Sequence, residues 1–153
     1  MSVKVLRPGL LTTVQDRGRY GLQHLGIVPC GAMDATAHTL ANALVGNEGD
    51  EATLEITVLG PELEFERTAL VALCGAEFDA RADGRALPPS RPVLLEAGTR
   101  LAARRALRGA RAYLAVAGGL ALEEVLGSRS TYVPARFGGL DGRALQALSL
   151  IHI

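Results

Sequence analysis

Two arginines, a carboxylate and a glycine lie together near the N-terminus, in the run Asp16-Arg17-Gly18-Arg19. Gln15 precedes this run and adds an amide that could orient a polar ligand. A guanidinium group matches the oxygens of a carboxylate or a phosphate, so Arg17 and Arg19 could bind an anion. A polar hairpin end with a solvated ion pair would use the same residues, and such a short motif leaves both interpretations open.

A helix is predicted directly after this run, over residues 34–45. Asp34 is a typical N-cap, the residues after it favour a helix, and Gly46 is a typical stop. Four apolar residues fall on one face, which we expect to pack inward: Ala37, Leu40, Ala41 and Leu44.

The same predicted helix carries a polar face. Asp34, His38 and Asn42 are spaced by four residues, which places them one above another. This face could be solvated, or it could line a site near the helix start, where free N–H groups attract anions. Asp34 could equally serve only as the cap of its helix.

The composition indicates one globular domain without a strongly charged partner. The chain has 153 residues, 48% of them hydrophobic, and its 16 cationic side chains balance its 16 anionic ones. This balance argues against binding to nucleic acid or to an anionic membrane, and the apolar runs are too short to span a bilayer.

Lys4 is the only lysine, so no internal lysine can carry biotin or serve a phosphate-binding P-loop. Cys30 and Cys74 lie far apart and no signal-peptide pattern precedes them, so we expect reduced thiols in a cytoplasmic protein.

Short strands separated by turns are predicted for most of the remaining chain. Residues 62–66 alternate between apolar and acidic, residues 69–74 form a continuous apolar run, and Asp83-Gly84 is a strong hairpin signal. Glu55 lies on a predicted strand, where we expect it to pair with an arginine. A short second helix is predicted at about 120–126, ending at Gly127. Many short strands with regular turns favour a mainly β fold, closed or sandwiched.

Several short motifs occur in a particular order along the chain. They are TVQDRGR (13–19), GAMD (31–34), ANALVGN (41–47), LEIT (54–57), YLAVAGG (113–119), LGSRST (126–131) and GGLDGR (138–143). In this order they resemble the biotin-dependent carboxyltransferase-like family, which includes the C subunit of 5-oxoprolinase, allophanate hydrolase subunit 2 and the kinase-inhibitor antagonist KipA. The resemblance implies a cyclophilin-like β-barrel.

The resemblance also implies an activity. Together with the A and B subunits of 5-oxoprolinase as partners, such a protein would hydrolyse 5-oxo-L-proline to L-glutamate, using ATP and Mg²⁺. One alternative is a biotin-dependent carboxyltransferase that acts on urea or a related amide, with biotin on a separate carrier. Another is a non-catalytic, KipA-like module that binds a kinase inhibitor.

Site residues follow from the positions that match the family motifs. Asp16 and Asp34 are the candidate catalytic residues, and the resemblance implies that they could hold Mg²⁺ or act as a base. Arg129-Ser130-Thr131 could contact substrate or could only close the turn after the second helix. The residues expected to bind substrate or phosphate are Gln15, Arg17, Arg19, Asn42, Arg129, Ser130 and Thr131. The sequence identifies no other metal ligands.

Family members are usually longer than this chain. We therefore expect residues 1–146 to be part of a carboxyltransferase-like domain whose C-terminal half is absent, and residues 147–153 to be a tail of doubtful origin. Barrel strands whose partners lie in that absent half would have unpaired edges, so we expect poor solubility without a partner.

Overall fold

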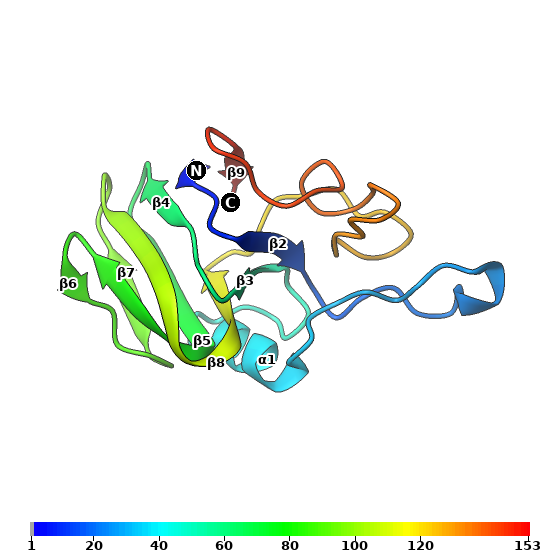
Figure 1. Cartoon of the computed structure of the whole chain (residues 1–153), viewed down its shortest axis with the longest axis horizontal. Coiled ribbons are helices and arrows are strands. Elements are labelled where there is room, and N and C mark those ends of the chain that lie inside the picture. The colour runs from blue at the N-terminus through cyan, green and yellow to red at the C-terminus, as the bar shows by residue number, and fades with distance from the viewer. Residues whose placement is uncertain (1) are drawn as a thin grey trace.

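The computed structural model describes residues 2–153 and consists mainly of β-strands (Figure 1). One α-helix, α1 (Ala35–Leu44), and one 3-10 turn, η1 (Gln23–Leu25), interrupt the strands. The strands are β1 (Ser2–Arg7), β2 (Leu11–Gln15), β3 (Thr53–Thr57), β4 (Glu62–Phe65), β5 (Ala69–Ala82), β6 (Arg85–Ala86), β7 (Pro92–Leu95), β8 (Arg100–Val116) and β9 (Leu150–His152).

The strands form one curled, antiparallel sheet. Its main order is β2-β3-β8-β4-β1-β9, and β5 adds to β8 and also pairs with β6 and β7. The long strands β5 and β8 run side by side and bend together, so the sheet curls like half of a barrel (Figure 1). This arrangement confirms the predicted mainly β class and agrees with a cyclophilin-like barrel.

One face of the sheet holds the main hydrophobic core. Leu63 and Phe65 on β4 are fully buried, whereas the acidic residues between and beside them point outward, as the alternation predicts. Buried side chains from β1, β3, β5 and β8 complete this core. A smaller apolar cluster lies between α1 and the opposite side of β5 and β8, where Ala37 and Ala41 pack against Cys74 and Tyr113.

The first predicted helix is confirmed, with a correction to its inward face. Asp34 caps α1 by accepting a hydrogen bond from the backbone N–H of Ala37 at 2.9 Å. Leu40, however, is 44% exposed, while His38 and Asn42 are fully buried. The small alanine side chains let the helix approach the sheet closely, and this rotates the predicted polar face toward the protein.

The predicted second helix at 120–126 is wrong. These residues have no helical structure, and Leu126 has a left-handed φ of 55°. Leu120 is buried in the core, and the backbone N–H of Ala121 donates to the carbonyl of His152. A segment of this length gains little from helical hydrogen bonds, so these tertiary contacts decide its conformation.

The last residues of the chain pack against the first strand. Within the predicted tail at 147–153, β9 pairs with β1 in the register Val3 to Ile151, and Ile151 is buried. The doubtful origin of the tail stays a prediction, because pairing in a structure does not test it. Within residues 2–153, no helix is long and apolar enough to cross a membrane.

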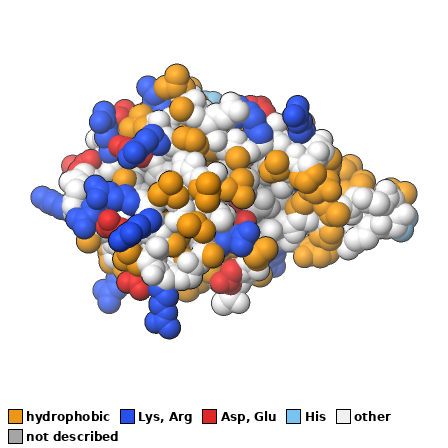
Figure 2. Space-filling view, viewed as in Figure 1, with side chains coloured by type: hydrophobic (Ala, Val, Ile, Leu, Met, Phe, Trp, Pro, Cys, Tyr) orange, Lys and Arg blue, Asp and Glu red, His pale blue; other side chains and the backbone are white. Residues whose placement is uncertain are grey.

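Residues 17–33 leave the sheet after β2 and form a projecting arm before the chain enters α1 (Figure 1). Two backbone hydrogen bonds close the base of the arm, from Arg19 N to the carbonyl of Pro29 and from Ala32 N to the carbonyl of Asp16. Figure 2 shows hydrophobic side chains gathered toward the arm, and most of the Lys and Arg side chains of this face at the opposite end of the molecule. Tyr20, on the arm, is 69% exposed.

Candidate functional site

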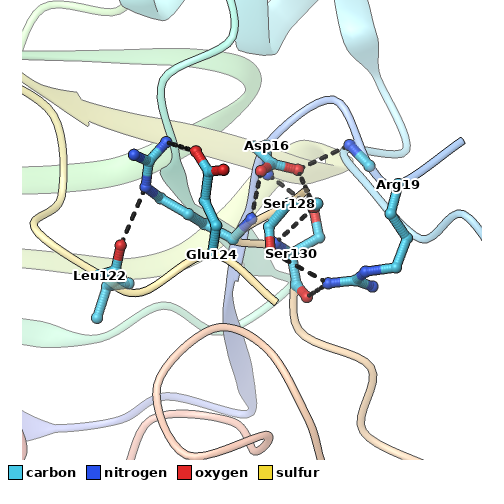
Figure 3. Close-up of polar contacts among 8 residues, drawn as sticks. Asp16, Arg19, Leu122, Glu124, Ser128 and Ser130 are labelled. Carbon is cyan, nitrogen blue, oxygen red and sulfur yellow. Dashed lines mark hydrogen bonds and ion pairs between the residues drawn. The ribbon is translucent and has the colours of Figure 1, made fainter. Parts of the chain in front are cut away.

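The side chain of Asp16 lies at the end of β2 and is buried (Figure 3). Its Oδ1 atom accepts hydrogen bonds from the hydroxyls of Ser128 (2.6 Å) and Ser130 (2.5 Å) and from the backbone N–H of Gly18 (2.7 Å). Its Oδ2 atom accepts from the backbone N–H of Arg129 at 2.5 Å. Burial raises the pKa of Asp16, but these four hydrogen bonds outweigh it and hold the pKa below its ordinary value. Asp16 is therefore an ionised anchor for the segment that contains Ser128 and Ser130.

Arg19 anchors the same segment from the other side. The residue is 1% exposed, and its guanidinium donates to the carbonyls of Ser130 (2.5 Å) and Val125 (3.2 Å). It also lies over the ring of Phe137, 4.9 Å from the ring centroid. The predicted phosphate-binding cation therefore binds backbone carbonyls of its own chain.

Three further predicted residues satisfy each other or the backbone. Gln15 donates to the carbonyl of Thr131 at 3.3 Å and accepts from the backbone N–H of Gly31 at 3.2 Å. The hydroxyl of Thr131 donates to the carbonyl of Val14 at 2.9 Å. Arg129 lies 3.1 Å from the carboxylate of Glu124 and donates to the carbonyl of Leu122.

The structure thus brings six predicted residues together, and we call them the Asp16 cluster. Their polar groups are directed mainly at one another and at backbone atoms, so the cluster joins the end of β2 to the segment after residue 125. Their predicted roles in catalysis or binding stay predictions. The members are Gln15, Asp16, Arg19, Arg129, Ser130 and Thr131.

The two predicted residues on the helix lie outside this cluster. Asn42 is fully buried, donates to the carbonyl of Glu51 at 2.8 Å and accepts from the side chain of Asn47 at 2.9 Å. It therefore fixes the chain after the helix. Asp34 is exposed and caps the helix through Oδ1. Neither residue approaches Asp16 through a hydrogen bond.

Arg17 is the predicted residue that faces an open space. It is exposed, has no ion-pair partner among residues 2–153, and borders a hollow of about 280 Å³. Tyr20 from the arm and Thr39 and His38 from α1 also line this hollow. The arginine-bearing bend and the helix therefore form one wall of this hollow. We call this space the Arg17 hollow.

His38 is a member of this wall that the sequence did not single out as a site residue. Its side chain is fully buried and meets the ring of Tyr113 edge to face at 6.0 Å, and its ring nitrogens have no hydrogen-bond partner within the described chain. Burial lowers the pKa of His38, although the nearby backbone of Glu51 opposes this shift. The ring is therefore neutral near pH 7. In the sequence, the feature that pointed to His38 was its spacing of four residues from both Asp34 and Asn42.

The predicted Mg²⁺ ligands do not fit a metal ion as they stand. The oxygens of Asp16 accept N–H and O–H hydrogen bonds, and one oxygen of Asp34 is used by the helix cap. Across residues 2–153, no three His, Cys, Asp or Glu side chains come together in a way that could hold a metal. ATP, Mg²⁺ and carrier-bound biotin stay predictions.

Comparison with known proteins identifies the relatives of this chain. Residues 25–153 match the family model of the carboxyltransferase domain, subdomain A and B. The chain is 44% identical over 144 residues to the 5-oxoprolinase C subunit of Escherichia coli (strain K12), covering 94% of this chain and 46% of that protein. It is 38% identical to the urea amidolyase of Lachancea kluyveri, covering 94% of this chain but 8% of that enzyme.

Solved structures agree with these matches. The crystal structure of the K. lactis urea amidolyase superposes with a TM-score of 0.97 at 35% identity, over 99% of this chain and 9% of that one. The chain spans about half the length of the 5-oxoprolinase C subunit that it matches. These matches show that the chain belongs to the carboxyltransferase domain family, subdomain A and B, which is a biotin-dependent carboxyltransferase-like family.

Proposed function

We propose that this chain acts within the C subunit of an ATP-dependent 5-oxoprolinase, which hydrolyses 5-oxo-L-proline to L-glutamate together with the A and B subunits. The observation that carries the proposal is the 44% identity to a 5-oxoprolinase C subunit, which extends over 94% of this chain. The organisation of the site supports a shared pocket, because the Arg17 hollow is partly open to solvent and leaves room for a partner surface.

The chemistry of lactam opening explains what such a wall contributes. A lactam carbonyl is a poor electrophile, and ATP would supply the phosphoryl group that turns its oxygen into a leaving group. The phosphoryl oxygens and the carboxylate of 5-oxoproline are both negatively charged. A cation that is held in position would stabilise either group. Arg17 presents a guanidinium without an ion-pair partner in the described chain, and neutral His38 lies beside it without adding a second positive charge. Arg17 is thus the residue that would bind the substrate carboxylate or the transferred phosphoryl group.

Carboxyl transfer to urea or a related amide is the second candidate function. The close superposition on the K. lactis urea amidolyase supports it. Lys4, the only lysine, is built into β1, where it pairs with β4 and β9. Biotin would therefore have to be carried outside the described residues.

Reconstitution with partner proteins tests the proposal. The full chain is mixed with homologues of the A and B subunits from the same genome, and ADP release and glutamate formation are followed with 5-oxo-L-proline. We expect turnover only when all three proteins are present. Arg17→Ala should abolish most of it without weakening the complex, and Arg67→Ala, at an exposed arginine that does not line the hollow, should leave it unchanged.

The other outcomes separate the alternatives. Consumption of carboxybiotin that depends on urea, with no response to 5-oxoproline, would replace the proposal by carboxyl transfer. Tight binding to a partner without any turnover would favour the KipA-like binding module.

A further inference from the structure

A second hollow lies beside the start of α1, between the helix cap and the bent strands β5 and β8. It measures about 570 Å³, which is within the range of sites for small molecules. Asp34, Glu77, Arg108 and Arg111 contribute its charged groups. We call it the Arg111 hollow.

Two glycines create this space. The pairing of β5 with β8 shifts register on both sides of Glu77, and Gly75 and Gly109 have left-handed φ values of 106° and 82°. A Cβ atom at Gly75 would lie 2.7 Å from the carbonyl oxygen of Arg111, and one at Gly109 would lie 2.9 Å from the Cβ of Ala76. Only glycine lets both strands bend away here, so the hollow is built into the sheet.

The charged groups that line the hollow do not form ion pairs with one another. Glu77 and Arg108 stand opposite each other in the ladder, yet neither takes part in an ion pair within residues 2–153. Asp34 uses Oδ1 for its cap, and no hydrogen bond within the described chain reaches Oδ2.

Arg111 forms an ion pair with Glu55, which does not line the hollow. Its Nε atom lies 3.5 Å from Oε1 of Glu55, which confirms the expected pairing of Glu55 with an arginine. Glu55 also accepts a hydrogen bond from the hydroxyl of Tyr113 at 2.7 Å, and that hydroxyl accepts one from the backbone N–H of Asp34 at 2.8 Å. This chain of contacts fixes the arginine relative to the start of the helix. The terminal nitrogens of Arg111 donate to no acceptor within residues 2–153, so they remain available to a ligand.

The balance of charge selects the kind of ligand. Two guanidinium groups and two carboxylates line the hollow, so a simple anion would meet Asp34 and Glu77, and a simple cation would meet Arg108 and Arg111. We propose that the Arg111 hollow binds a small zwitterion of the amino-acid class, with its carboxylate toward the two arginines and its ammonium toward the two acids. This hollow is separate from the Arg17 hollow, where 5-oxoproline is proposed to bind, and 5-oxoproline lacks the ammonium group that the zwitterion site requires.

Three matched small molecules test the proposal by calorimetric titration of the full chain. L-Glutamine carries both charged groups, glutaric acid monoamide lacks the ammonium, and L-glutaminamide lacks the carboxylate. We expect saturable binding of glutamine and affinities at least about tenfold weaker for the other two, because each lacks one charge-assisted contact. Equal binding of the monoamide, or no saturable binding of glutamine, would overturn the proposal.

Variants show whether any binding occurs in this hollow. Arg108→Gln and Asp34→Asn should each weaken glutamine binding about tenfold. Asparagine caps a helix as well as aspartate does, so Asp34→Asn removes the charge while the melting temperature stays constant. Arg105→Gln, an exposed arginine on the same strand, is the matched control and should bind as the unmodified chain does. Unchanged affinity in both test variants would place the ligand elsewhere and contradict the assignment.

Discussion

Asp16 and Arg17 are adjacent in the chain, but the Asp16 cluster and the Arg17 hollow differ in how their charged side chains are paired. Within the cluster, Asp16 accepts four hydrogen bonds and Arg19 donates to several carbonyls, all inside the protein. At the hollow, Arg17 is exposed without an ion pair in the described chain, and His38 is buried without a hydrogen-bond partner among residues 2–153. Buried polar groups that are hydrogen-bonded stabilise a fold, and in the cluster the exception among the described residues is Nη1 of Arg19, which has no partner. An exposed cation without an ion pair, by contrast, is available to a ligand. The comparison therefore separates an internal anchor from a binding wall.

The largest effect is expected from Asp16→Asn. The asparagine amide would direct N–H donors at groups that already donate, leaving buried donors unpaired, so the free energy of unfolding should fall by about 3 kcal/mol or more. Urea unfolding measures this change. Asp50→Asn, at an exposed turn, is the matched control. A loss below about 1 kcal/mol would show that Asp16 is not an anchor.

The same carboxylate predicts a dependence on pH. Because the pKa of folded Asp16 lies below its ordinary value of 3.8, its stabilising contribution is complete above that value and is lost as the pH falls through the lower, folded-state pKa. Urea midpoints measured from about pH 6 down to about pH 2.5 should therefore decline less steeply in Asp16→Asn than in the unmodified chain. Parallel declines would contradict the assigned shift.

Gly31→Ala should have the next largest effect, because Gly31 closes the base of the arm against the cluster. Its φ is 90°, and a Cβ there would lie 2.7 Å from the carbonyl oxygen of Arg17. We expect a loss of about 2 kcal/mol or more from left-handed strain plus steric overlap. Gly21 has the same φ with nothing within 4 Å, so Gly21→Ala should lose only the strain, about 1 kcal/mol. Equal losses in the two variants, measured by urea unfolding, would mean that the close approach at the arm base does not matter.

A smaller effect of opposite sign is expected at the hollow. His38→Leu replaces two unpartnered buried nitrogens with an apolar side chain, so the free energy of unfolding should rise by about 1 kcal/mol. Urea unfolding again provides the measurement, with Thr39→Val as a control on the same helix. A clear loss of stability in His38→Leu would mean that the imidazole stabilises the fold after all.

Local patterns in the sequence predicted the local elements well. The cap at Asp34, the stop at Gly46 and the alternation along β4 all specify structure through neighbouring residues, and all three are found. The region at 120–126 could not be predicted in this way, because its conformation depends on a backbone contact with residue 152.

The sequence identified which residues belong to the site, but not whether each of them binds a ligand or another part of the protein. The sequence singled out Asp16, Arg19 and Ser130, and the hydrogen bond from Ser130 to Asp16 spans 114 residues that no local pattern can connect. Residue type and spacing identify groups that can bind an anion. Whether the protein itself already occupies those groups is decided only by tertiary packing, and this is why Arg17 and Arg19 have such different surroundings.

The most direct test of this comparison is the effect of Arg17→Ala on both stability and activity. Because Arg17 is exposed and has no ion pair within the described residues, the free energy of unfolding should change by less than about 0.5 kcal/mol. In the reconstituted mixture of all three proteins, 5-oxoproline-dependent ADP release should fall by about tenfold to a hundredfold, the cost of losing one charge-assisted contact. Full activity in Arg17→Ala, or a loss of stability comparable to that of Asp16→Asn, would contradict the assignment of the Arg17 hollow as the binding wall.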